Sequence, residues 1–249
     1  MNRALSLCYW LVVGLVAIAM FPVALLLWVV TRPFDRRGVV LHRFTNLWAL
    51  IYVSINPWWS LRVRGREHID PDATYVMVSN HQSLVDVFAL HGLRRHFKWV
   101  SKEENFRIPC IGWNMRLNDY VPLSRGSGRS VREMFERCQR ALRQGSSVLM
   151  FPEGTRSRTG RLRRFRPGAF ELAQQAGVAV LPIVVQGSFH ALRPHSLNIG
   201  RARIRVTVLR AISADEVEAL STEELMALTR ARIAEHVQRW PWPPQVPIG

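Results

Sequence analysis

Residues 73–90 read ATYVMVSNHQSLVDVFAL, and this stretch decides the fold. Its first part, Ala73–Ser79, is rich in apolar and β-branched residues and predicts a buried strand. The apolar residues that follow Asp86 predict a helix near Leu84–Leu93. A strand, a polar turn and a helix in direct succession are typical of α/β proteins, in which chemistry gathers at the carboxyl ends of parallel strands.

The same alternation continues after residue 60. The predicted strands are Leu61–Arg64, Thr74–Ser79, Phe97–Ser101, Asp119–Pro122, Val148–Phe151, Ala179–Gln186 and Arg203–Leu209. Further helices are predicted at Ser130–Arg143 and Ala169–Ala176, and Ser130 with Glu133 resembles a capping box for the first of them. We therefore expect an α/β fold of layered helices around a largely parallel sheet.

The end of the chain predicts one more helix. Ser221 and Glu224 indicate its start, and it should run to about Trp240. A tail with four prolines follows, which cannot pack as a helix. These patterns predict three parts: helices that anchor the chain to a membrane in residues 1–60, a catalytic domain in 61–212, and the C-terminal helix with its tail in 213–249.

The N-terminal region is apolar. Residues Ala4–Val30 carry no charged side chain and are long enough, at about 1.5 Å per residue, to cross a hydrocarbon core of roughly 30 Å. A secretory signal is the competing interpretation, but the apolar run is too long for one. Four arginines within residues 32–43, against Arg3 alone before the run, predict that the rest of the chain lies in the cytoplasm.

A second uncharged stretch, Phe44–Trp59, is too short to span a membrane and contains Trp48, Tyr52 and Trp58. Aromatic side chains with polar tips gather at the headgroup level of a membrane. We therefore expect an interfacial or re-entrant helix paired with the first, with a core helix as the alternative.

The composition indicates an anionic partner. The net charge is +16, and all but two of the 34 basic residues are arginine, whose planar fork suits phosphate. Phospholipid headgroups, phosphorylated substrates and nucleic acid all qualify. The three cysteines have no metal or redox spacing, and His91 and His96 are too far apart to form a zinc pair, so neither a disulfide framework nor a metal site is expected.

The polar turn after the first strand combines an imidazole and a carboxylate. His81 and Asp86 are five residues apart, so they do not share a helix face. A strand, a tight turn and the first turn of a helix would let Asp86 bind one ring nitrogen of His81 and leave the other as a proton acceptor. A solvent-facing histidine is the alternative.

A second polar stretch, Phe151-Pro152-Glu153-Gly154-Thr155-Arg156-Ser157, also follows a predicted strand. Gly154 permits a tight turn with exposed N–H groups, and Thr155 and Arg156 add donors, so the stretch predicts a phosphate or oxyanion cradle. An ordinary surface turn is the alternative. Five more arginines before the next acidic residue favour the anion site.

Together these stretches resemble the glycerolipid acyltransferases typified by 1-acylglycerol-3-phosphate O-acyltransferase. Residues 80–86 match the family's His-x4-Asp block and residues 151–157 its Phe-Pro-Glu-Gly-Thr-Arg-Ser block. Residues 120–125 and 180–184 resemble two further blocks in the same order, so the resemblance covers roughly residues 61–192.

The resemblance implies transfer of a fatty acyl group from coenzyme A or acyl carrier protein to the hydroxyl of a lysophospholipid in the membrane. It implies His81 and Asp86 as catalytic residues, and no cofactor or metal. It assigns the acceptor to Arg125, Glu153, Gly154, Thr155 and Arg156. Glycerol 3-phosphate, a lyso-ornithine lipid or another lysophospholipid are alternative acceptors. A membrane-tethered nucleic-acid binder is the rival from another class, although no nucleic-acid motif is present.

Overall fold

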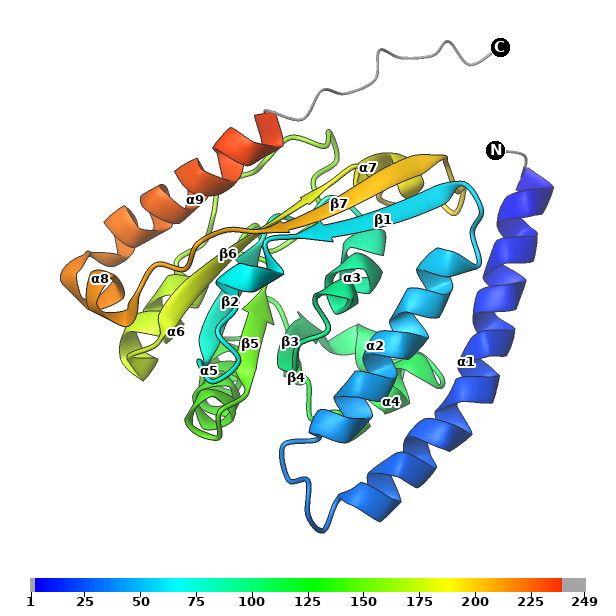
Figure 1. Cartoon of the computed structure of the whole chain (residues 1–249), viewed down its shortest axis with the longest axis horizontal. Helices are drawn as coiled ribbons and strands as arrows, with labels where there is room; N and C mark the ends of the chain where they lie inside the picture. Colours follow the sequence, from blue (N-terminus) through cyan, green and yellow to red (C-terminus); the bar gives the residue numbers. More distant parts are fainter. Residues whose placement is uncertain (1–2, 239–249) are drawn as a thin grey trace.

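The computed structural model describes residues 3–238 and has a seven-stranded sheet at its centre, with strand order β1-β7-β6-β2-β5-β3-β4 (Figure 1). The strands are β1 (Trp59–Arg64), β2 (Tyr75–Ser79), β3 (Phe97–Lys102), β4 (Val121–Leu123), β5 (Ser147–Met150), β6 (Ala179–Gln186) and β7 (Ala202–Val208). All neighbouring pairs are parallel except β6 with β7. The predicted α/β fold with a largely parallel sheet is confirmed.

Strand β2 shows why these segments form the centre of the sheet. It is buried along its whole length, and its side chains alternate between two cores: Met77 packs into the core on one face, and Val76 and Val78 into the core on the other. A strand that is apolar on both faces is stable only between two layers of helices. The turn that follows β2 is thereby held at a fixed place at the edge of the sheet.

The helices form those two layers. The α-helices are α1 (Arg3–Thr31), α2 (Val39–Ser54), α3 (Val85–Leu90), α4 (Ile111–Leu117), α5 (Gly128–Arg143), α6 (Gly168–Ala176), α7 (Ser188–Ala191), α8 (Ala214–Ala219) and α9 (Thr222–Gln238), and the short 3-10 helices are η1 (Arg66–His68), η2 (His91–Leu93) and η3 (Glu103–Arg107). Helices α2, α3 and α4 pack on one face of the sheet, and α5, α6, α8 and α9 on the other (Figure 1).

One predicted helix start is wrong and another is confirmed. Helix α5 begins at Gly128, two residues earlier than expected, because Ser127 is its N-cap and accepts a hydrogen bond from the backbone N–H of Ser130. Glu133 instead pairs with Arg129. At α9 the reciprocal hydrogen bonds of a capping box join Ser221 and Glu224, as predicted. Trp240 and the proline-rich tail lie outside the described residues.

Helix α1 lies along the domain and contacts α2 and α4 (Figure 1). It is a single helix of 29 residues, long and apolar enough to cross a membrane by length and composition. A narrow stripe that includes Tyr9, Val13 and Ala17 is buried against the domain. The opposite side is apolar and exposed, for example at Leu11, where 59% of the residue is accessible, and at Leu15, where 66% is.

Helix α2 differs from the expectation for its sequence. It pairs with α1, but Trp48 and Tyr52 are each only 3% exposed and belong to the core between α2, α3 and the sheet. Their polar tips are satisfied inside the protein, because Nε1 of Trp48 donates to the hydroxyl of Tyr52 at 2.6 Å. The alternative of a core helix is therefore correct, since aromatic residues mark a buried helix as readily as an interfacial one.

Candidate active site

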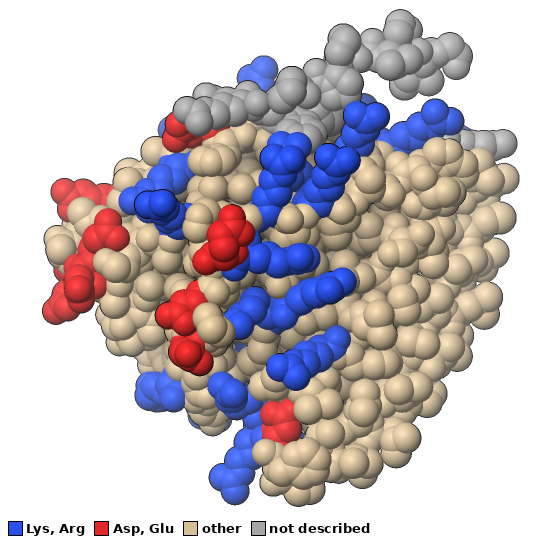
Figure 2. All heavy atoms as spheres, viewed as in Figure 1, with Lys and Arg blue, Asp and Glu red and all other residues tan. Residues whose placement is uncertain are grey.

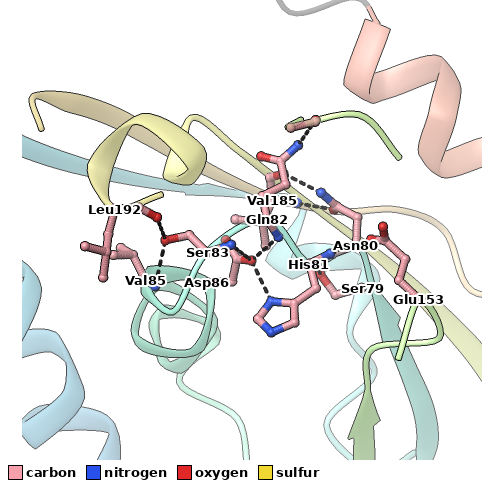
Figure 3. A network of polar contacts seen from close by, with 11 residues as sticks. Ser79, Asn80, His81, Gln82, Ser83, Val85, Asp86, Glu153, Val185 and Leu192 are labelled. Atoms are coloured by element: carbon pink, nitrogen blue, oxygen red, sulfur yellow. Dashed lines mark hydrogen bonds and ion pairs between the residues drawn. The ribbon is translucent and has the colours of Figure 1, made fainter. Parts of the chain in front are cut away.

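The site forms at the turn between β2 and α3 (Figure 3). Asn80 closes the end of the strand: its side-chain nitrogen donates to the carbonyl of Val185 in β6, and its side-chain oxygen accepts from the N–H of Val185, both at 2.8 Å. Gln82 donates to the carbonyl of Gly160 at 2.7 Å. These two side chains point to one side of the turn, and the ring of His81 points to the other.

His81 and Asp86 are in direct contact. Nδ1 of His81 lies 2.8 Å from Oδ2 of Asp86, and the same oxygen accepts hydrogen bonds from the backbone N–H groups of Gln82 and Ser83, at 2.6 and 2.8 Å. Asp86 is fully buried, whereas 15% of the His81 side chain is exposed. The five-residue spacing therefore has the geometry predicted for it, a carboxylate in the first turn of a helix that reaches back to the preceding turn.

This contact leaves the other ring nitrogen available. A hydrogen bond from Nδ1–H to the carboxylate places the proton of the neutral ring on Nδ1 and the lone pair on Nε2. No residue between 3 and 238 hydrogen-bonds to Nε2. The ring stacks on Phe151, with centroids 3.9 Å apart and planes 11° apart, and Phe151 stacks in turn on Trp99. The imidazole is thus fixed in orientation, with a free proton acceptor.

Glu153 lies beneath the turn and braces it. It is 3% exposed, and both carboxylate oxygens are used within the protein: Oε1 accepts from the backbone N–H of His81 at 2.7 Å, and Oε2 from that of Arg163 at 2.9 Å. Burial raises the pKa of Glu153 to about 7, although these two donors oppose the shift. The structure therefore gives Glu153 a supporting role in the site, and its contact with the acceptor stays a prediction.

The loop of residues 151–157 has a glycine turn at its centre. Gly154 has φ of +69°, which favours glycine, and a Cβ there would lie 3.0 Å from Nε of Arg166. Arg125 reaches this loop from the end of β4 and donates to the carbonyl of Gly154. Thr155 and Arg156 are partly exposed. Within residues 3–238 no acceptor binds their backbone N–H groups, so both groups remain available to a ligand.

The structure therefore brings together the residues that the sequence singled out. His81 and Asp86 form the pair, and the loop with Gly154, Thr155 and Arg156 is joined to that pair by Glu153 and by a hydrogen bond from the N–H of Ser157 to the carbonyl of His81 at 2.9 Å. Their contact with an acceptor stays a prediction.

Two serines near the base are excluded as nucleophiles by their partners. Ser83 is fully buried, and its hydroxyl donates to the carbonyl of Leu192 at 2.7 Å. Ser157 is 1% exposed and donates to the carbonyl of Arg161 at 2.6 Å. Among residues 3–238 no group of three or more His, Cys, Asp or Glu side chains is arranged to hold a metal ion.

Sequence reasoning missed three supports of this site: the stacked Phe151 and Trp99, the double hydrogen bond of Asn80 to β6, and the bracing role of Glu153. The signal for Phe151 was its place at the end of a predicted strand beside the turn. Asn80 and Glu153 depend on contacts 105 and 72 residues apart, which a local pattern does not encode.

An oriented His–Asp pair at the carboxyl end of a parallel strand, beside a loop with free N–H groups and arginines, has the arrangement of a general base next to an anion site. Residues 60–186 match the family described as acyltransferase. The chain belongs to this family.

Two plant relatives are acyltransferases by name. The chain is 39% identical over 196 residues to a chloroplastic 1-acyl-sn-glycerol-3-phosphate acyltransferase of Arabidopsis thaliana, a match that covers 78% of the chain and 53% of the relative. It is 36% identical over 241 residues to a chloroplastic enzyme of that name from Brassica napus, covering 94% and 67%. The chain thus spans between half and two thirds of these relatives.

A solved structure has the same fold. The crystal structure of the 1-acyl-sn-glycerophosphate (LPA) acyltransferase PlsC from Thermotoga maritima superposes with a TM-score of 0.83, covering 97% of this chain and 98% of that one, at 23% sequence identity. This comparison confirms the α/β architecture.

Proposed function

We propose that this chain transfers a fatty acyl group from a thioester to the free hydroxyl of 1-acylglycerol-3-phosphate, giving phosphatidic acid. The observation that carries the proposal is the contact of Nδ1 of His81 with Asp86. This contact and the stacking on Phe151 hold the ring, and Nε2 remains free on a side chain that is 15% exposed. The names of the relatives in the acyltransferase family support the choice of acceptor.

The chemistry follows from this arrangement. An alcohol is a weak nucleophile at neutral pH, so Nε2 of His81 takes the hydroxyl proton as the oxygen attacks the thioester carbonyl. Asp86 faces the imidazolium that results and stabilises it. The carbon–sulfur bond then breaks, and the thiolate leaves; a thiol has a reference pKa of about 8.5, so it needs no strong acid. Because Ser83 and Ser157 are buried and bonded, direct transfer is favoured over a covalent acyl-serine.

The loop of residues 154–156 is suited to the phosphate of the acceptor. The N–H groups of Thr155 and Arg156 and the guanidinium groups of Arg125 and Arg156 supply donors beside the base, and arginine binds phosphate in a bidentate manner. Holding the acceptor's phosphate there would place its hydroxyl near His81, and such positioning contributes several kcal/mol to catalysis.

The exposed apolar side of α1 suits a membrane that supplies the acceptor. Because α1 packs along its length against α2 and α4, contact through this outer side keeps the domain at the membrane surface. The arginines that follow α1 favour the cytoplasmic face for the catalytic domain.

The test is an assay of purified protein with lysophosphatidic acid and a long-chain acyl-CoA. We expect acyl transfer, a loss of about 10²–10⁴-fold in kcat for His81→Ala, and a rise of about tenfold in the acceptor KM for Arg156→Ala with a smaller effect on kcat. Circular dichroism should show both variants folded. Full transfer by the His81 variant would remove the mechanism.

Other acceptors are distinguished in the same assay. Glycerol 3-phosphate, a lyso-ornithine lipid and other lysophospholipids are offered in turn, and the phosphate-free acceptor should gain nothing from Arg156. Acyl carrier protein replaces coenzyme A in a parallel series to identify the donor.

A further inference from the structure

A cavity of about 1090 Å³ lies at the edge of the sheet that β4 forms. Its wall is made by the loop between α1 and α2, by η3 and α4, by the start of β4 and by α5. Sites for small molecules are typically of roughly 300–1000 Å³. Neither His81 nor the loop of residues 151–157 belongs to the lining, so this cavity is separate from the candidate active site.

The lining of the cavity is basic. It contains seven basic and four acidic residues, and three of the acidic residues pair with arginines: Asp119 with Arg32, Glu133 with Arg129 and Glu103 with Arg107. The other basic residues of the lining form no ion pair within residues 3–238; they are Lys98, Arg36, Arg37, Arg116, Arg137 and Arg140. The cavity is therefore suited to an anion.

Lys98 is the buried cation of this wall. It is 4% exposed, and its Nζ donates to the carbonyls of Arg37 and Asn118, each at 2.7 Å. An ammonium group has three donors, and the third has no acceptor among residues 3–238. Burial lowers the pKa of Lys98 to about 8, although Asp119 and Asp35 oppose the shift. A buried charge without a counterion is costly, so an anion in the cavity would stabilise this ammonium group.

The cavity begins where the exposed apolar side of α1 ends. Val29 lies about five helical turns beyond Leu11, on the same side of the helix at about 3.6 residues per turn, and it is 56% exposed. In the loop that follows, Arg32 and Arg36 line the cavity, whereas Phe34 between them is 74% exposed. The apolar side of α1 therefore leads directly to the basic wall of the cavity.

An exposed apolar side chain lies on the other side of the cavity as well. Trp113 of α4 is 45% exposed, and its ring packs against that of Phe21 in α1 with centroids 5.2 Å apart. Arg116, three residues further along α4, lines the cavity. Figure 2 shows a broad uncharged area where α1 and α2 lie in Figure 1, with charged side chains beside it down to the lower end, where the loop between the two helices lies. A phospholipid has the same arrangement, with hydrocarbon next to phosphate.

We propose that this cavity binds the phosphate headgroup of an anionic phospholipid whose acyl chains lie against the exposed side of α1. The inference rests on the proposed membrane contact of α1. Lys98 and the arginines of α5 supply the donors for the phosphate. Because the wall combines the loop after α1 with α5, which packs on the other face of the sheet, a bound headgroup would join the membrane-facing helix to the far side of the domain.

The experiment measures how fast trace acetic anhydride acetylates Lys98 in the full-length protein, held in micelles of a neutral detergent at pH 8. Lys102, whose side chain is 46% exposed, is the other lysine of the chain and serves as the internal reference in mass spectrometry. The micelles contain no lipid, phosphatidylcholine or phosphatidylglycerol. Coenzyme A and inorganic phosphate are added to lipid-free micelles in two further arms, at the concentration used for phosphatidylglycerol.

Phosphatidylglycerol should slow the acetylation of Lys98 about fivefold or more. At pH 8 about half of the Lys98 side chains are neutral and reactive. A phosphate within about 4–6 Å raises the pKa by about one unit or more, which lowers the neutral fraction to about a tenth. Phosphatidylcholine, coenzyme A and inorganic phosphate should each change the rate less than about twofold.

A pair of variants on one helix locates the effect. R137Q/R140Q removes two arginines of the lining, and the matched control R132Q/R143Q removes two exposed arginines of α5 outside it. Each arginine contributes about 1 kcal/mol to binding an anionic headgroup, so the first variant should need about thirtyfold more phosphatidylglycerol for half protection. The control should stay within about threefold of the native protein. Circular dichroism should show both variants folded.

No protection by phosphatidylglycerol, equal protection by phosphatidylcholine, or the same loss in both variants would overturn the proposal. Protection by coenzyme A without protection by phosphatidylglycerol would assign the cavity to the phosphates of the acyl donor, and protection by inorganic phosphate alone would make it a general anion site; in either case the lipid assignment is wrong. Flotation of the native protein with phosphatidylcholine vesicles measures the contact of α1 separately. Acyl transfer is not measured, so a failure here leaves the proposed function standing.

Discussion

Asp86→Asn tests whether the carboxylate orients and stabilises the base. Oδ2 of Asp86 accepts three hydrogen bonds, from Nδ1 of His81 and from the N–H groups of Gln82 and Ser83. An amide oxygen can accept all three, but each bond to a neutral acceptor is weaker by about 1 kcal/mol. The amide nitrogen would replace Oδ1, which is buried and has no partner among residues 3–238. Burying this unsatisfied donor adds up to about 2 kcal/mol to the loss of stability. We expect a loss of about 3–5 kcal/mol in the free energy of unfolding.

The catalytic effect of this substitution has a different origin. When His81 takes a proton, the imidazolium faces a carboxylate in the native protein and a neutral amide in the variant. We expect kcat for acyl transfer to lysophosphatidic acid to fall by about 10²–10⁴-fold. Stability is measured by urea unfolding, and kcat at a temperature where circular dichroism shows the folded state.

A control separates the two effects. Asn118→Ala removes buried hydrogen bonds to Thr45 and Asn114, remote from the turn after β2, so it should lower stability and leave kcat unchanged. A kcat for Asp86→Asn within about threefold of the native value, at any stability, would refute the assigned role of Asp86. An equal fall in the Asn118 variant would show that kcat reports stability alone.

Three further outcomes are expected. Glu153→Gln sets an amide N–H against the backbone N–H of either His81 or Arg163, which disturbs the support of the turn, so kcat should fall about tenfold with the acceptor KM unchanged. A raised KM at constant kcat would instead place Glu153 in contact with the acceptor. Burial lowers the pKa of His91 and of His96 to about 3, below the value in the unfolded chain, so each histidine opposes folding as the pH falls below about 6.5. His91 alone should lower the free energy of unfolding by about 2 kcal/mol at pH 5. Equal urea midpoints at pH 7 and pH 5 would contradict this. Leu15→Glu puts a charge on the exposed side of α1 and should weaken binding to phosphatidylcholine vesicles at least tenfold in a flotation assay, whereas the same change at exposed Val131 on α5 should not.

Local sequence patterns predicted both the strands and the His81–Asp86 pair. Buried strands are continuous apolar runs, so β2 ends where Asn80 begins, and Asp86, five residues beyond His81, can reach back to that imidazole. Arg125 and Gly154 were assigned to the same acceptor site only through the resemblance to the family, and the contact between them, which joins residues 29 apart, was not predicted.

The errors arose where one local pattern fits two structures. Ser127 and Ser130 are both suitable N-caps for α5, and the choice depends on the backbone: Ser127 is extended, and the hydroxyl of Ser130 accepts from the N–H of Ser124. Trp48 and Tyr52 suit an interface or a core, and the packing of α2 between α1 and α3 decided for the core. Glu153 carries a charge, so its burial was not expected from composition.

The bonds to residue 81 have a mechanical consequence. Its N–H is held by Glu153 and its carbonyl by Ser157, two residues of the same loop that carries Thr155 and Arg156. The proton acceptor and the proposed anion cradle are therefore joined directly by two hydrogen bonds, one to Glu153 and one from Ser157. If a headgroup binds the loop as proposed, a shift of the loop is passed to residue 81, so recognition and proton removal are mechanically linked.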